Sequence, residues 1–490
     1  MSVGRRGGRL TWRPVADSVT ERPAPREGGF KRLTRNIGET LSRWLRAEIA
    51  KPVASPNGII EAIRLEGLPS VAAPGVAEDP LDLTSALLDT GAELEHALMI
   101  EYLYAAASAA DPGVARALAR IAAQEMGHLA TVQNLRLALG LPAYMGRQDL
   151  APQPGQDPFP FKREPLSLDA LAKYAAAERP SHEHVAPDLE ALVTEILARA
   201  NAAVGGAIPR VGTIYATLYW LFLPTDGTNA KPWPDFPEDV FRAANVPQLA
   251  ATAFGALERQ AEPIEWRAST QGLEVIVCDT GEAAVRAIYR IAAQGEGLAN
   301  SVDSHFPQFV DLYRRMRDQG LDVHDVPVDP HVGGGAPSSE VDHPLAVAAN
   351  AVLDAAYAAL QIEILIVFTL TRTGVEAPLR RALISHLLSE GMLAAVAPLG
   401  RLLCSTLPRR AGQAADDGAC AGAIFSPVQA TSGDRAALLV HWKAAIDGLE
   451  AAVDAALQLP DDSGLLGGVL ADITDHVGTK RTLWNRISNI

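Results

Sequence analysis

The sequence contains little cysteine. Its three cysteines, Cys278, Cys404 and Cys420, are too few and too scattered for a disulfide framework or a thiolate metal site. A reducing compartment is therefore expected, which favours a cytoplasmic location. The chain also lacks a run of about 18 uninterrupted apolar residues, so no membrane span is predicted. The paired arginines in "MSVGRRGGRLTW" are not followed by an apolar segment, which argues against a twin-arginine export signal.

Positive charge is also scarce. The chain has 43 Lys and Arg against 58 Asp and Glu, for a net charge of −15. Nucleic-acid binding needs clustered basic residues to neutralise phosphates, and no such stripe follows the N-terminal segment, so nucleic acid is excluded as a partner. Aromatic residues make up only 6% of the chain although 48% of it is hydrophobic. The core must therefore consist mainly of alanine, leucine and valine, which suits close-packed helices and predicts an all-α fold.

Helical patterns alternate with segments rich in proline and glycine. The sequence predicts a basic Pro/Gly-rich arm at residues 1–55 and a helical, metal-binding domain at 56–325. A linker is expected at 326–344 and a C-terminal helical domain at 345–490. We therefore expect two helical bundles.

The first bundle is expected to begin with two long helices. One runs from about Leu83 to Ala110, "DPG" at 111–113 ends it, and the next runs to about Leu139. The aromatic stretch 211–224 is predicted to be a helix whose aromatic side chains belong to the core. The stretch "PWPDFPEDVF" at 232–241 is expected to be a loop.

Three ionisable residues are expected at one level of the first two helices. Glu95 lies 16 residues before Asp111, while Glu125 and His128 lie 14 and 17 residues after it. In an antiparallel pair that turns at Asp111, a rise of about 1.5 Å per residue places all three within one helical turn. Glu95 lies on an apolar face, where a carboxylate costs several kcal/mol unless it binds a cation. The alternative, Glu101, lies closer to the turn and on a different face, so we prefer Glu95.

This combination of one Glu with Glu-x-x-His on the next helix is half the ligand pattern of a carboxylate-bridged di-iron bundle. The alternative is a chance pair on a surface helix, since E-x-x-H occurs by chance on many helices. Candidates for the other half are Glu178, just before Pro180, and Glu296 with His305. From composition alone each of these three is more simply an ordinary surface or capping residue.

Four stretches occur in a distinctive order: "LEHALMIEYLYAA", "QEMGHLATVQNLRLALG", "YAAAERP" and "QGEG…SHFPQF". They resemble the ferritin-like domain family of the iminophenylpyruvate and indolepyruvate-imine dimer synthases, known from bisindole and violacein biosynthesis. The resemblance covers about residues 80–490. It implies a ferritin-like four-helix bundle with long loops, followed by a second C-terminal helical bundle.

The resemblance also implies a di-iron ligand set. It names as ligands Glu95, Glu125, His128, Glu178, Glu296 and His305. It places Tyr102 beside the metals, as a catalytic residue. Two positions depart from the family pattern: Gln124 stands where a glutamate is usual, and Glu101 stands where many members have proline or glutamine.

The activity implied is that of an O2-dependent non-haem di-iron oxidase or oxygenase. Its substrate would be a small, amino-acid-derived molecule of secondary metabolism, with two Fe ions as cofactor and O2 as co-substrate. The ligand types also accept Mn or Zn. The alternatives are a ferroxidase or iron-handling protein, and a non-catalytic partner subunit with a structural metal site. The expected partner is a small-molecule substrate, with a homodimer as the candidate assembly. The chain is much shorter than the dimer synthases, so their oxidative coupling is not carried over.

A second set of polar residues lies in the C-terminal block. Glu363 in "LQIEILIVF" and His386 with Glu390 in "SHLLSEGM" hint at another metal site. Because a full carboxylate set is missing, a structural ion pair is the preferred interpretation.

Overall fold

The structure is a computed structural model, and it describes residues 80–147, 162–180, 185–208, 210–224, 233, 236, 238–243, 248–249, 254–268, 272–296, 304–412, 418–428, 434–461 and 464–490. The arm predicted at 1–55 lies outside these residues. The described part is all-α, as predicted, and its β structure is limited to isolated bridges such as that between Ala109 and Val323.

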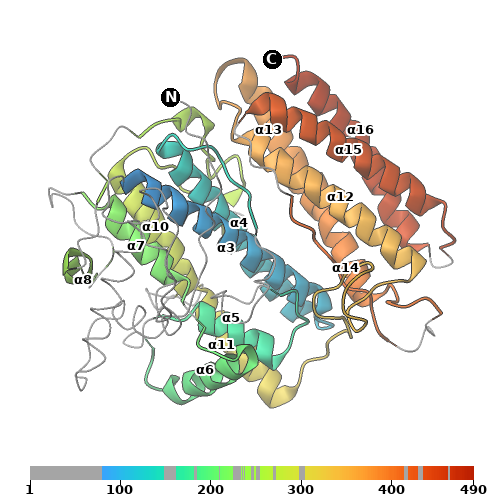
Figure 1. The fold of residues 1–490 in the computed structure, drawn as a ribbon, viewed down its shortest axis with the longest axis horizontal. Helices are drawn as coiled ribbons and strands as arrows, with labels where there is room; N and C mark the ends of the chain where they lie inside the picture. The colour runs from blue at the N-terminus through green and yellow to red at the C-terminus, as the bar shows by residue number, and fades with distance from the viewer. Residues whose placement is uncertain are drawn as a thin grey trace, which may run out of the picture.

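Four helices form the ferritin-like bundle (Figure 1). They are α3 (Pro80–Ser108), α4 (Pro112–Ala138), α7 (Gly212–Phe222) and α10 (Gly281–Glu296). Helix α3 packs along α4 and also touches α7, while α10 packs on α7 and touches α4. The interior between them is therefore bounded by helices on four sides.

The turn between α3 and α4 is fixed by Asp111. Its carboxylate accepts hydrogen bonds from the backbone N–H groups of Gly113 and Val114 at 2.7 and 2.8 Å, and Pro112 occupies the first helical turn. The chain thus reverses where "DPG" predicts it. Both helices are buried on most of their surface, which explains why polar residues such as Glu95 and His128 lie within the protein.

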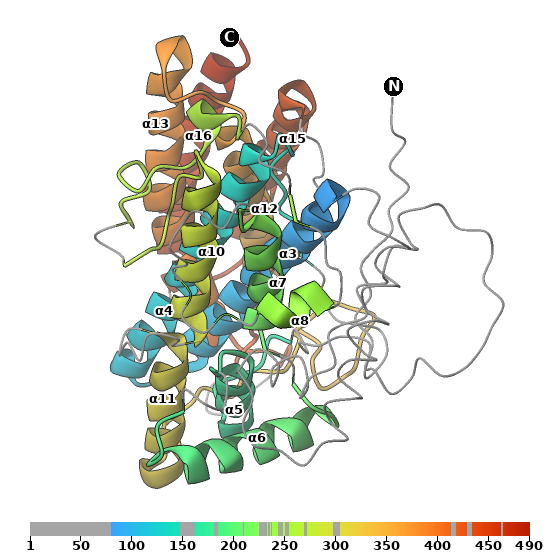
Figure 2. The same ribbon diagram turned by 90° about the vertical axis from the view of Figure 1, so that its left-hand side faces the viewer.

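Three further helices lie at one end of this bundle (Figure 2). They are α5 (Leu168–Ala177), α6 (Glu190–Val204) and α11 (His305–Gln319), and α5 packs on both α6 and α11. The short 3₁₀ helix η3 (Leu257–Arg259) lies near α4.

Helix α7 confirms the helix predicted at 211–224, but the loop predicted at 232–241 is partly wrong. Its last residues begin α8 (Glu238–Ala243). An ion pair of 2.9 Å between Glu238 and Arg242 supports this short helix, and the ring of Phe241 stacks on Trp220 of α7.

The C-terminal bundle follows residues 320–343. It consists of α12 (Pro344–Val367), η4 (Gly374–Glu376), α13 (Ala377–His386), the π-helical segment η5 (Leu387–Val396), α14 (Ala397–Ser405), α15 (Arg435–Leu457) and α16 (Leu465–Ile487). Helix α12 packs on α15, which packs on α16, and η5 contacts both α12 and α16. Helix α14 lies next to α3 (Figure 1). The buried apolar side chains of the two bundles belong to one continuous core. The domain boundaries given above remain predictions.

Two described helical segments are long and apolar enough to span a membrane: Pro344–Val367 and Gly374–Ser405. In the first, 78% of the most apolar window is buried within the protein, and in the second 50%. Core helices of water-soluble proteins pass the same test of length and composition. The absence of a membrane span therefore remains a prediction.

Candidate metal centre

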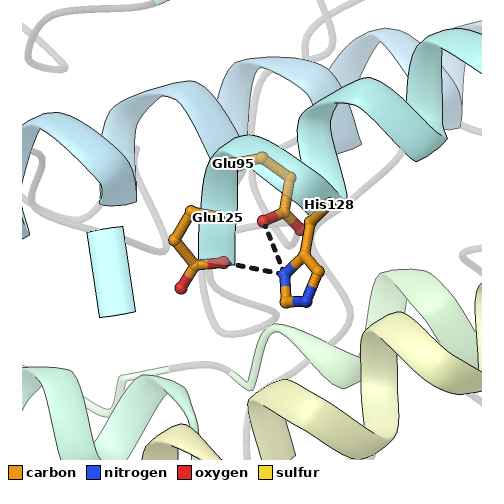
Figure 3. A group of neighbouring side chains, drawn as sticks. All are labelled: Glu95, Glu125 and His128. Carbon is orange, nitrogen blue, oxygen red and sulfur yellow. Dashed lines mark hydrogen bonds and ion pairs between the residues drawn. The ribbon is translucent and has the colours of Figure 1, made fainter. Parts of the chain in front are cut away.

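Glu95 of α3 meets Glu125 and His128 of α4 in the bundle interior (Figure 3). The Nδ1 atom of His128 lies 2.8 Å from Oε2 of Glu125 and 3.3 Å from Oε2 of Glu95. Each residue is only 1% exposed. The three side chains, here called the first ligand group, thus meet at the level that the helix geometry predicts.

A second ligand group shares Glu125 with the first and adds Glu178 and His305. The Nδ1 atom of His305 lies 3.0 Å from Oε1 of Glu125 and 3.7 Å from Oε1 of Glu178. Glu178 directly follows α5 and His305 is the first residue of α11, so both come from helix ends. Glu125 therefore directs one oxygen toward each imidazole.

Glu296, the remaining candidate ligand, is the last residue of α10. Its side chain lies outside the described residues, so its place in the ligand set remains a prediction.

Glu101, the alternative to Glu95, does not join either ligand group. Its carboxyl is buried near Lys173 and Glu164, and burial raises its pKa well above the ordinary value. The preference for Glu95 therefore agrees with the structure.

A glutamine on α10 orients His128. Oε1 of Gln294 lies 3.0 Å from Nε2 of His128, while Nε2 of Gln294 donates to the carbonyl of Gly272 at 3.3 Å. A carbonyl oxygen facing Nε2 of His128 favours a proton on that nitrogen. Nδ1, which lies 2.8 Å from Oε2 of Glu125, is then the nitrogen that faces the ligand group and would bind a metal after losing its own proton. Such a partner on the far ring nitrogen is usual for metal-binding histidines. Gln294 is not among the site residues predicted from the sequence, although it is the first residue of the stretch "QGEG".

Two tyrosine hydroxyls donate to the outer carboxylates. Tyr102 donates to Oε1 of Glu178 at 2.8 Å, and Tyr215 of α7 donates to Oε1 of Glu95. Tyr102 therefore lies beside the ligand groups as the resemblance implies, and its catalytic role remains a prediction. Tyr215 was assigned only to the core, because an aromatic residue in an apolar helix gives no sign of a polar partner.

Gly295 makes room for Glu178. A Cβ atom at position 295 would lie 2.8 Å from Oε2 of Glu178, which is too close for the carboxylate in its present position. The glycine thus allows α10 to approach this carboxylate.

Electrostatics favour a cation between the carboxylates. Burial and the neighbouring Glu125 raise the pKa of Glu95 to about 8, and the same two causes raise the pKa of Glu178. Burial also opposes ionisation of Glu125, but the imidazoles of His305 and His128 more than offset it and lower its pKa. Without a cation, the site must hold extra protons to balance its carboxylates.

The pKa values of the two imidazoles are raised by the neighbouring carboxylates. Burial disfavours the charged ring of His305, yet Glu125 and Glu178 raise its pKa to about 9. Several donor atoms have no hydrogen-bond partner among the described residues, namely Oε2 of Glu95, Oε1 of Glu125 and both ring nitrogens of His305. Because buried polar atoms normally have partners, this donor set fits metal binding.

Comparisons with known proteins found a family model and a solved structure to which the chain is similar. A family model described as Ferritin-like matches residues 88–314, a range that contains all the candidate ligands. A crystal structure of a ferritin-like protein from Caulobacter vibrioides is similar at 17% identity and a TM-score of 0.38, covering 66% of this chain and 93% of that one. None of the curated proteins matches the chain. Residues 88–314 are therefore similar to a ferritin-like domain, and they contain carboxylate and histidine groups compatible with a metal site.

Proposed function

We propose that this chain is an O2-dependent non-haem di-iron oxidase or oxygenase that acts on a small molecule. The observation that carries the proposal is the position of Glu125, whose two oxygens face imidazoles from two different helices. A carboxylate in this position is suited to bridge two cations.

The described donors fit two metal ions. Glu95 and His128 would hold one ion, Glu178 and His305 the other, and Glu125 would bridge them. Carboxylate oxygens combined with imidazole nitrogens suit Fe(II), and also accept Mn or Zn. When bound, a pair of ferrous ions supplies the electrons that reduce O2.

The protein's own contribution is to hold the donors and keep water out. The hydroxyls of Tyr102 and Tyr215 fix the outer carboxylates, and Gln294 fixes the His128 ring. A small cavity of about 10 Å³ borders the ligands and has an apolar wall from Ile291 and Ala292. These apolar side chains offer water no hydrogen-bond partner, so they limit access by water on this side of the ligands.

The resemblance of the sequence stretches to the dimer synthases supports an amino-acid-derived substrate from secondary metabolism. It is the basis for proposing that substrate class. A cytoplasmic location is proposed from the low cysteine content.

A ferroxidase or iron-handling role is the second candidate, because the ferritin-like domain is compatible with it. The large C-terminal bundle packed onto α3 favours the oxidase, since a storage shell needs only a compact bundle. A partner subunit with a structural metal is the third candidate.

The test is iron loading followed by exposure to oxygen. Metal-free protein is given Fe(II) anaerobically, the bound iron is counted, and O2 consumption is then measured. We expect about two irons per chain and O2 uptake, both lost in Glu125→Ala and both kept in the control Glu101→Gln. Iron that accumulates far beyond this ratio as ferric oxide would favour iron handling. One zinc, or no metal, without O2 uptake would contradict the oxidase and favour the structural site.

A further inference from the structure

A second group of histidine and glutamate side chains lies in the C-terminal bundle. The Nδ1 atom of His386 lies 2.6 Å from Oε2 of Glu390, and the Nδ1 atom of His476 lies 3.1 Å from the same oxygen. The two imidazole rings are 6.3 Å apart between centroids, at 80° to each other. These three residues, here called the C-terminal triad, are far from the ferritin-like ligands in sequence and belong to different helices.

The π-helical segment η5 positions two members of the triad. His386 ends α13 immediately before η5, Glu390 lies within η5, and His476 comes from α16, which packs against it. The wider π turn is uncommon and is frequent at functional sites. The expected His386–Glu390 pair is therefore present. His476 is an addition that no feature of the sequence predicts.

The imidazole nitrogens of the triad lie close to the Glu390 carboxylate without forming hydrogen bonds to it. Both ring nitrogens of His386, Oε2 of Glu390 and Nε2 of His476 have no hydrogen-bond partner among the described residues. His386 is only 3% exposed, and a buried ring without any partner is costly. The contact of Glu125 with His305 in the ferritin-like domain has the same character: a distance of 3.0 Å between two atoms that lack hydrogen-bond partners. Ligands of a cation lack such partners because their lone pairs point to the ion. In the triad the three donor atoms do not all lie within 4.8 Å of one another, so the two rings must move closer together when they bind an ion.

The nearby lysine does not oppose a cation strongly. The positive charge of Lys480 is compensated, because Lys480 forms an ion pair with the buried Glu363. Glu363 also accepts a hydrogen bond of 2.9 Å from Nε1 of Trp442. Glu363 thus belongs to a separate ion pair.

We propose that His386, Glu390 and His476 bind one divalent transition metal of the zinc class, independently of the ferritin-like site. Two imidazoles and one carboxylate are a usual zinc donor set that leaves a coordination position open. The side chain of Glu390 is 32% exposed, so it can turn outward and let the ion enter between the two rings.

The test compares zinc binding by the full-length chain and three variants. Metal-free protein is equilibrated with zinc ions alone, and bound zinc is counted by elemental analysis. His476→Gln and Glu390→Gln are expected to bind about one zinc fewer than wild type. The control His441→Gln, at an exposed position on α15, is expected to bind as much as wild type.

Two further readouts keep the result interpretable. Circular dichroism and the Tm of the metal-free variants should match wild type, since His476 and Glu390 are both partly exposed. In a Glu125→Ala background, zinc should still raise the Tm, and His476→Gln should abolish this rise. Equal zinc content in wild type and His476→Gln would overturn the proposal while leaving the ferritin-like site unaffected.

Discussion

Oε1 of Glu125 lies 3.0 Å from Nδ1 of His305, and neither atom has a hydrogen-bond partner among the described residues. The other oxygen of the same carboxylate lies 2.8 Å from Nδ1 of His128. One side chain of α4 thus connects two ligand groups that otherwise come from different parts of the chain. Glu125 is therefore the residue on which both halves of the candidate centre depend.

This arrangement predicts that substitution of the bridging ligand removes more bound metal than substitution of an outer ligand. Glu125→Gln removes a carboxylate that serves both ions, so metal content should fall from about two per chain to nearly none. Glu178→Gln removes an outer ligand, so about one ion should remain. Elemental analysis after Fe(II) loading measures both. Equal losses in the two variants would argue against a bridging position for Glu125.

The contact between Gln294 and His128 predicts a weaker metal site when it is removed. Gln294→Leu leaves Nε2 of His128 without its acceptor, and losses of this kind reduce metal affinity by about 10–100-fold. Gln294→Glu keeps an acceptor oxygen and should recover most of the affinity. Competition with a chelator of known affinity gives the comparison, and unchanged affinity in Gln294→Leu would show that Gln294 does not orient the ligand.

Gly295 provides a steric test of the second ligand group. Gly295→Ala would place a Cβ 2.8 Å from Oε2 of Glu178, so the carboxylate must move and the metal held by Glu178 and His305 should bind more weakly. The control is Gly478→Ala in α16, where no atom lies within 4 Å of the added Cβ. That change should leave metal binding intact and raise the free energy of unfolding by about 0.5–1 kcal/mol. Normal metal content in Gly295→Ala would contradict the prediction.

Stability of the metal-free protein should fall as pH rises. In the folded chain His305 keeps its proton up to a pKa of about 9, whereas its ordinary value is 6.5, and the pKa of Glu95 is raised from 4.5 to about 8. Because the folded state then binds more protons than the unfolded state, the free energy of unfolding decreases between pH 6.5 and 9. Urea unfolding of the metal-free chain across this range measures the slope, and a rise in stability would contradict it.

The same protons compete with metal. Binding must displace them, so apparent metal affinity should increase over this pH range and binding should release protons. Calorimetry in two buffers with different ionisation enthalpies detects the release. Identical heats in both buffers would indicate that the site holds no extra protons.

Substitution of Arg380, which lies outside the candidate metal centre, should strongly lower the free energy of unfolding. Its buried guanidinium donates to the carbonyls of Val367 and Leu370 and pairs with Glu265, so it connects α12 and α13 to the segment after η3. Arg380→Leu would leave these groups without partners and should lower the free energy of unfolding by about 3–5 kcal/mol. Arg381→Leu, at the exposed neighbouring position, should change it by less than about 0.5 kcal/mol. Urea unfolding of both variants makes the comparison.

Local features of the sequence are sufficient to predict the first two helices and the level at which Glu95, Glu125 and His128 meet. This succeeded because the N-cap of Asp111 and the rise of a helix are local properties that depend on few neighbouring residues. The same local signals predicted the helix that became α7. These local signals did not predict α8, which lies in a proline-rich stretch. There the ring of Phe241 stacks on Trp220, a contact between residues that are distant in sequence.

The way in which the remaining groups come together depends on how the helices pack. Glu178, His305 and Tyr215 reach the centre from α5, α11 and α7, and His476 reaches η5 from α16. Glu178 and His305 were expected as ligands because of the family resemblance, and their spacing along the chain gave no such expectation. Contacts of this kind depend on how whole helices pack after intervening loops, and the rise per residue that fixes positions along one helix does not fix the distances between helices.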